Sequence, residues 1–181
     1  LNKRIELYVY MAEESDWEPL KAYIKTHDLP QTNITIDAEY PVVTAEKGYG
    51  TVKLVFNKQD KPTISPYVSA FSGGFFGSQI PEDASATIEN ANIVLLQRLM
   101  RKGVSFALEL KNTTLTINAL GKSAHSSKPD EGVNAIPYLA DLLSSTRWEN
   151  NGPGTLVNFI NDNIGLGLEG KMFGNIAYKD D

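Results

Sequence analysis

The chain has 181 residues, a formal net charge of −5 and no cysteine, and 41% of its residues are hydrophobic and 22% charged. This composition is typical of a soluble globular protein with one large or two small cores. The absence of cysteine excludes disulfides and thiolate zinc sites, so a metal site would have to use carboxylates and imidazoles. There is no basic cluster, no secretory signal and no apolar run near the ~18 residues of a membrane helix. We therefore expect a cytoplasmic protein that binds neither nucleic acid nor membranes.

The first 45 residues carry an α/β pattern. Residues 4–11 are rich in β-branched and aromatic side chains and predict a strand. Apolar residues at helical spacing predict a helix over residues 17–27, and residues 34–36 predict a second, short strand. Because two or three strands do not make a stable sheet alone, we expect this segment to be part of a larger α/β sheet.

Acidic residues stand at the ends of both predicted strands. Glu13 and Glu14 lie where the first strand gives way to the helix, which is where ligands and catalytic groups collect in α/β folds. The alternative is that they only favour the helix N-terminus electrostatically. Asp37 follows the second strand and is either a ligand or an ordinary turn residue. Two glycines around Tyr49 then suggest a hinge, and we place a domain boundary near residue 46.

The remainder of the chain predicts a second domain. The pattern indicates strands at 51–57, 67–71, 84–88, 104–110 and 114–120, and helices at 91–102, 134–145 and from Pro153 to Ile164. The natural arrangement is an α+β, two-layer domain with one mostly antiparallel sheet and helices on a single face. Phe75 and Phe76, in a glycine-rich loop, are either core residues or a substrate-facing wall, and we expect them in the core.

The loop at residues 121–129 holds His125, one of only two histidines in the chain. It follows the predicted hairpin and precedes a helix. The ordinary interpretation of such a histidine is a solvated loop residue. A functional interpretation is favoured here because two other segments point to the same chemistry.

These three segments resemble the di-zinc dipeptidases of the carnosinase-like metallopeptidase family, of the Xaa-His dipeptidase or dipeptidase V type. Residues 13–17 (EESDW) are similar to the acidic pair of that family. Residues 37–41 (DAEYP) followed by 46–48 (EKG) are similar to a second signature. Residues 121–126 (GKSAHS), with Asn134 and Ala135 following, are similar to its lid motif.

The resemblance implies a set of roles. Glu13 would be the general base, and Glu14 and Asp37 would be ligands of two different zinc ions. His125 would reach the scissile carbonyl from the lid, and Ser78 stands where the family has a substrate-binding asparagine. Zinc lowers the pKa of a bound water toward ~7, a carboxylate can take its proton, and an imidazole can stabilise the oxyanion.

The chain lacks other ligands that the family needs, namely a His-x-Asp segment and a bridging aspartate upstream of Glu13, and a further histidine near the C-terminus. Ala12 also departs from the family pattern. The sequence is therefore interpreted as an internal fragment: residues 1–45 from a catalytic domain and residues 46–181 from an incomplete lid. It would bind zinc partially or not at all, and would be inactive alone.

We expect the parent protein to be a zinc dipeptidase with dipeptide substrates. Two alternatives remain open: a related N-acyl-amino-acid deacylase of the acetylornithine or succinyl-diaminopimelate type, and a non-catalytic lid or interaction module. As a fragment, this chain is expected to self-associate through an exposed edge of the lid sheet.

Overall fold

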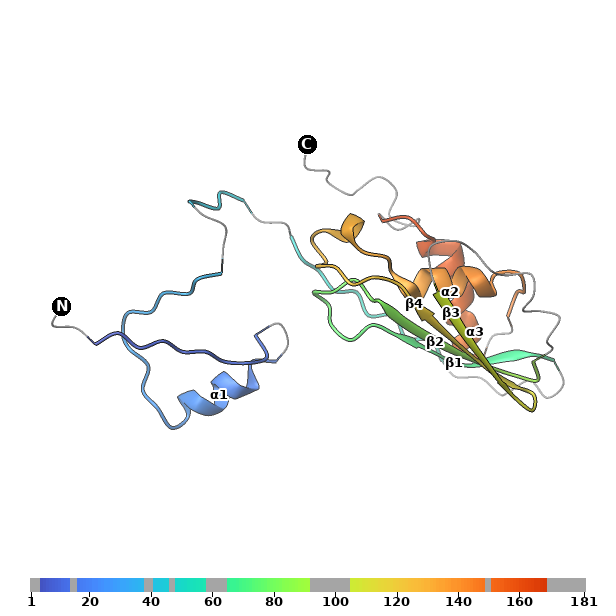
Figure 1. Cartoon of the computed structure of the whole chain (residues 1–181), viewed down its shortest axis with the longest axis horizontal. Coiled ribbons are helices and arrows are strands. Elements are labelled where there is room, and N and C mark those ends of the chain that lie inside the picture. The colour runs from blue at the N-terminus through green and yellow to red at the C-terminus, as the bar shows by residue number, and fades with distance from the viewer. Residues whose placement is uncertain are drawn as a thin grey trace. The chain divides into compact units, whose positions relative to one another are not determined.

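The computed structural model describes residues 4–13, 16–37, 41–45, 48–57, 65–91, 105–148 and 151–168. The chain divides into two compact units, Leu1–Gly50 and Thr51–Asp181 (Figure 1). The interpretation of these parts as a catalytic segment and a lid stays a prediction. No helix in the described ranges is both long and apolar enough to cross a membrane.

The first unit contains helix α1, Glu18–Ile24. Pro19 lies in the first turn, where its missing N–H costs nothing, and Glu18 interacts favourably with the helix N-terminus. The carboxylate of Asp16 accepts a hydrogen bond of 3.0 Å from the backbone N–H of Glu18. The helix predicted at 17–27 is confirmed, although it is shorter at both ends.

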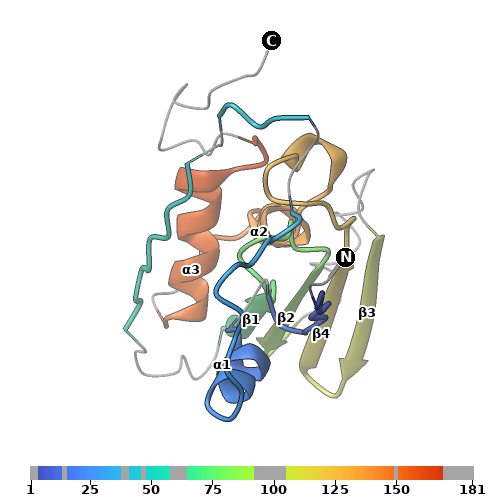
Figure 2. The same cartoon turned by 90° about the vertical axis from the view of Figure 1, so that its left-hand side faces the viewer.

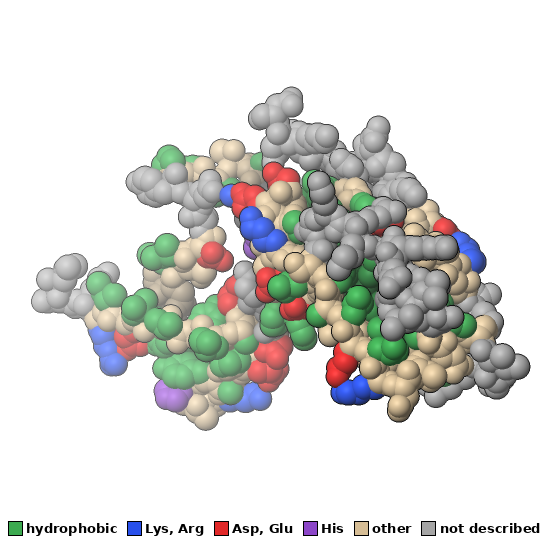
Figure 3. All heavy atoms as spheres, turned by 45° about the vertical axis from the view of Figure 1, so that its right-hand side comes forward, with side chains coloured by type: hydrophobic (Ala, Val, Ile, Leu, Met, Phe, Trp, Pro, Cys, Tyr) green, Lys and Arg blue, Asp and Glu red, His purple; other side chains and the backbone are tan. Residues whose placement is uncertain are grey.

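Three predicted strands do not form in the described residues. Residues 4–11, 34–36 and 51–57 have no strand pairing there, and their aliphatic side chains are exposed, among them Ile5 by 84%, Leu7 by 87% and Ile36 by 92%. Figure 3 shows hydrophobic side chains at the surface. A strand forms only when a neighbour satisfies its backbone N–H and C=O groups, and these segments pair with no strand in the described part of the chain. The alternating pattern is present, but among the described residues no partner pairs with it to make a strand.

The second unit is built on a four-stranded antiparallel sheet in the order β1-β2-β4-β3. The strands are β1 Tyr67–Gly73, β2 Asp83–Glu89, β3 Ser105–Lys111 and β4 Thr114–Leu120. The predicted hairpin is confirmed, with Lys111 opposite Thr114 and Asn112 in the left-handed conformation at φ 56° in the turn. A register shift between Val68 and Ala70 adds a bulge to β1.

Helices cover one face of this sheet (Figure 2). Helix α2, Ala135–Leu143, lies against β2 and β4, and helix α3, Pro153–Phe159, lies against β1 and continues as a π-helix, η3, over Ile160–Ile164. Asn134 caps α2, because its side-chain oxygen accepts a 3.1 Å hydrogen bond from the N–H of Ile136. The α+β fold class is confirmed, while most of the helix predicted at 91–102 falls outside the described residues.

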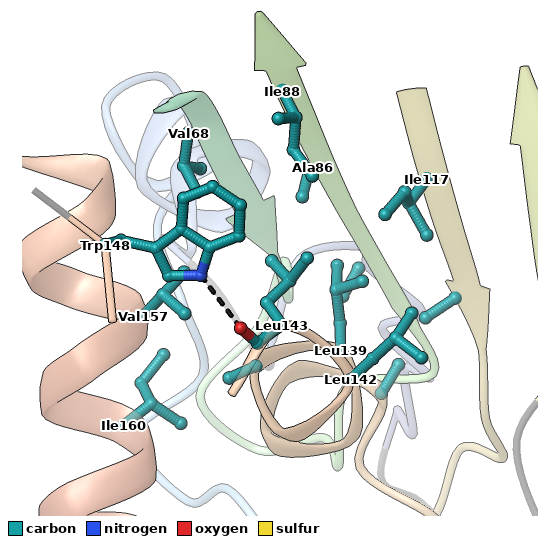
Figure 4. Packing of buried hydrophobic residues seen from close by; sticks show 14 of the residues in the cluster. Val68, Ala86, Ile88, Ile117, Leu139, Leu142, Leu143, Trp148, Val157 and Ile160 are labelled. Carbon is teal, nitrogen blue, oxygen red and sulfur yellow. Dashed lines mark hydrogen bonds between the residues drawn. The ribbon is translucent and has the colours of Figure 1, made fainter. Parts of the chain in front are cut away.

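The core lies between the sheet and these helices (Figure 4). Leu139 and Leu143 of α2 are buried against side chains from β1, β2 and β4, and burial of each contributes about 1.5–3 kcal/mol. The indole of Trp148 is 3% exposed and donates a 2.9 Å hydrogen bond to the carbonyl oxygen of Leu143. Phe75 and Phe76, which we expected in the core, are instead exposed by 83% and 54% on the loop after β1.

Candidate functional site

The loop that carries His125 is closed at its base by backbone hydrogen bonds. After β4, Lys122 and Val133 exchange hydrogen bonds of 2.9 and 2.8 Å, which join the two ends of the loop. The N–H of Gly121 also donates a 2.7 Å hydrogen bond to the carbonyl oxygen of Glu82. A side chain at position 121 would place its Cβ 2.1 Å from the Val133 oxygen, so only glycine fits this approach. The loop therefore leaves the sheet in a defined direction.

The same loop pairs with the segment that carries Ser78. Ile80 donates to the carbonyl oxygen of Ala124 and Ser126 donates to that of Ser78, each over 2.8 Å. Between these two bonds, Gln79 and His125 face one another in an isolated antiparallel bridge. The structure thus brings His125 and Ser78, two of the predicted site residues, onto adjacent backbone segments.

Side chains reinforce this pairing. The amide nitrogen of Gln79 donates a 2.6 Å hydrogen bond to the hydroxyl of Ser123, and the backbone N–H of Ser123 donates over 3.3 Å to the carboxylate of Glu82. All three residues are partly buried. Gln79 and Glu82 belong to no motif, and their partner Ser123 lies 44 and 41 residues further along the chain, so sequence patterns do not point to them.

The imidazole of His125 is exposed, yet one of its edges is held. Its Nδ1 atom accepts a 3.2 Å hydrogen bond from the backbone N–H of Ser127 and lies 2.7 Å from the hydroxyl oxygen of the same residue. The backbone N–H of Lys128 donates to the carbonyl oxygen of His125 over 2.9 Å. An exposed ring on a fixed loop, with one nitrogen engaged, is suited to contact a ligand through its other nitrogen.

A hollow of about 30 Å³ adjoins this loop pair. It is lined by Gly74, Phe75, Gln79, Pro81, Glu82 and Asp83. This volume is about that of one water molecule, so the hollow cannot enclose a dipeptide.

The other predicted site residues belong to the first unit. Glu13 is exposed in the turn before α1, and Asp37 is exposed in the extended segment after it. Glu14 lies outside the described residues. In the ranges that the structure covers, no group of three or more histidine, aspartate or glutamate residues is placed to hold a metal ion. The ligand roles of Glu14 and Asp37 stay predictions.

Comparison with known proteins relates this site to peptidases. Residues 111–175, which include β4, the His125 loop, α2 and α3, match the peptidase dimerisation domain. A protein of Staphylococcus aureus strain USA300 named "Putative dipeptidase" is 33% identical over 162 residues, covering 82% of this chain and 34% of that protein. A protein of Staphylococcus saprophyticus with the same description is 29% identical over 168 residues, covering 87% of this chain and 34% of that protein. The chain spans about a third of the length of these relatives.

Proposed function

We propose that the protein containing this chain is a metal-dependent dipeptidase of the carnosinase-like type. Both comparisons support this, because they point to the M20 peptidase family. The observation that carries the proposal is the position of His125. This exposed imidazole is held on a clamped loop, inside the segment that matches a peptidase domain. Similarity to dipeptidase-named proteins over 82% of the chain supports the same family well beyond the matched domain.

Each site residue has a role in this proposal. His125 donates a hydrogen bond to the oxygen of the scissile carbonyl as negative charge develops there, an effect worth about 3 kcal/mol per donor. Glu13 accepts a proton from the attacking water on its carboxylate and passes it to the leaving amine. Ser78 contacts the substrate beside His125. Glu14 and Asp37 would contribute carboxylate ligands for zinc, together with ligands from elsewhere in the protein; bound zinc lowers the pKa of water toward ~7.

The division into two units fits this assignment of roles. The proposed base and ligands lie in the first unit, whereas His125 and Ser78 lie in the second. The proposed oxyanion donor therefore comes from a different unit than the proposed base.

Self-association is also part of the proposal. Strand β3 forms one edge of the sheet, and its Leu108 and Leu110 are exposed by 45% and 40%. An edge strand with apolar side chains favours pairing with another chain. Light scattering of the 181-residue chain should therefore give a mass that rises with concentration, and a constant monomer mass would contradict this part.

A substrate panel tests the proposed activity. The full-length protein, loaded with zinc, is expected to release free amino acids from dipeptides and to lose this activity on treatment with a chelator. Hydrolysis of N-acyl amino acids without cleavage of dipeptides would instead identify the deacylase alternative. If neither class is hydrolysed and partners are still bound, the protein would be the non-catalytic module.

A further inference from the structure

The hydrogen bonds of His125 determine which ring nitrogen carries the proton. A backbone N–H can only donate, so the N–H of Ser127, 3.2 Å from Nδ1, requires a lone pair on that atom. A neutral imidazole with a lone pair on Nδ1 carries its hydrogen on Nε2. The hydroxyl of Ser127, 2.7 Å from Nδ1, can add a second donor to the same lone pair.

We propose that Ser127 is a positioning residue that holds His125 as the Nε2–H tautomer, with the N–H directed away from the loop toward substrate. This inference rests on the proposed function. A carbonyl oxygen that gains negative charge is stabilised by a donor and repelled by a lone pair, so the opposite tautomer would oppose the reaction. Ser127 thereby ensures that His125 donates a hydrogen bond to the substrate, although Ser127 does not touch the substrate itself.

The second histidine of the chain, His27, has hydrogen-bond partners that favour the opposite tautomer. Its Nδ1 lies 3.3 Å from the carbonyl oxygen of Tyr23, which can only accept, and its ring stacks on that of Tyr23 with centroids 4.1 Å apart. The hydroxyl of Thr26 donates over 3.2 Å to the same carbonyl and therefore accepts from Nδ1, 2.9 Å away. His27 is thus assigned the Nδ1–H form, the reverse of His125.

Nitrogen-15 NMR of the 181-residue chain tests the tautomers of His125 and His27 in one experiment, since the chain has only two histidines. The spectra are recorded at alkaline pH, on the plateau where the ring signals no longer change with pH. Two-bond proton–nitrogen correlations then identify the protonated nitrogen of each ring, and a His27→Gln variant assigns the signals. We expect Nε2–H at His125 and Nδ1–H at His27, whereas the denatured chain should give one averaged pattern for both.

Matched serine variants isolate the role of Ser127. Ser127→Ala removes the hydroxyl but keeps the backbone N–H that donates to Nδ1, so the His125 nitrogen signals should move part of the way toward the denatured average, and Ser127→Thr should restore them. Ser126→Ala is the control, because the hydrogen bond of Ser126 to Ser78 uses its backbone N–H. Nδ1–H at His125 would overturn the tautomer assignment, and equal spectra for the two alanine variants would overturn the role of the Ser127 hydroxyl.

Kinetics of the full-length protein separate this inference from the proposed function. Ser127→Ala should lower kcat about tenfold, the lower end of what loss of a hydrogen bond that orients a metal-ligating histidine costs, with a smaller change in KM. Ser127→Thr should recover most of the activity. An unchanged kcat would refute the positioning role even with the tautomer as assigned. Failure of the wild-type protein to cleave any dipeptide would refute the proposed function, while the NMR result still decides the tautomer.

Discussion

The side-chain amide of Gln79 donates a 2.6 Å hydrogen bond to the hydroxyl of Ser123, which lies 44 residues further along the chain. Ser123 is bound in turn to the carboxylate of Glu82 through its backbone N–H. These contacts join the loop that carries His125 to the loop that carries Ser78. The geometry of the candidate site therefore depends on residues that would not themselves contact a substrate.

Removing the Gln79 amide should loosen this junction. Gln79→Ala deletes one hydrogen bond between partly buried groups, and we expect a loss of about 1 kcal/mol in the free energy of unfolding. Local opening should rise more than global unfolding, so the amide protons of Ile80 and Ser126 should exchange faster. Gln31→Ala, at an exposed position in the first unit, is the control and should leave exchange in this loop unchanged.

Gly121 is expected to tolerate no side chain. Gly121→Ala places a Cβ 2.1 Å from the backbone oxygen of Val133, and relief of this clash requires the base of the loop to open. We expect a loss of about 2–4 kcal/mol in urea-induced unfolding. Gly50→Ala is the matched control, since nothing lies within 4 Å of a Cβ there. Equal stability of the two variants would contradict the closed loop base.

Shortening a buried leucine should destabilise the chain more than shortening an exposed one. Leu139 of α2 is 0% exposed, and Leu139→Ala should destabilise the chain by about 2–5 kcal/mol through lost burial and a residual cavity. Leu166, which is 42% exposed, is the comparison, and Leu166→Ala should change stability by at most about 0.5 kcal/mol. Thermal unfolding monitored by circular dichroism measures both. Similar midpoints for the two variants would place the core elsewhere.

Local signals allowed much of the second unit to be predicted. The hairpin of β3 and β4 needs only a short turn between two alternating segments, and α2 needs only its Asn134 cap and apolar face. Residues 4–11 carry an equally clear strand pattern, but a strand also needs a partner, which the pattern does not encode. The neighbourhood of Ser78 and His125 was equally out of reach, because it depends on β2 pairing with β4 across the sheet.

His125 is expected to matter for catalysis and little for folding. In the full-length protein, His125→Ala should lower kcat about 10²- to 10³-fold, as the loss of one oxyanion donor does elsewhere. Because the ring is exposed, the unfolding midpoint of the 181-residue chain should not change. Lys128→Ala, at an exposed position in the same loop, is the kinetic control. A His125→Ala enzyme with normal kcat would exclude this residue from the reaction.

The first unit offers a test at alkaline pH. The carboxylate of Glu6 accepts a hydrogen bond from the hydroxyl of Tyr8, and this contact is the main reason why the pKa of Tyr8 rises from 10.0 to about 12. The folded chain therefore holds the phenol proton more tightly than the unfolded chain. The stabilisation is complete below about pH 10 and is lost as the pH rises toward 12.

Tyrosinate absorbance should show Tyr8 ionising late, and Glu6→Gln should shift one of the eight tyrosines back toward its ordinary pKa. In a Tyr8→Phe background the same substitution should have no effect. A shift that persists without Tyr8 would mean that Glu6 acts on another tyrosine.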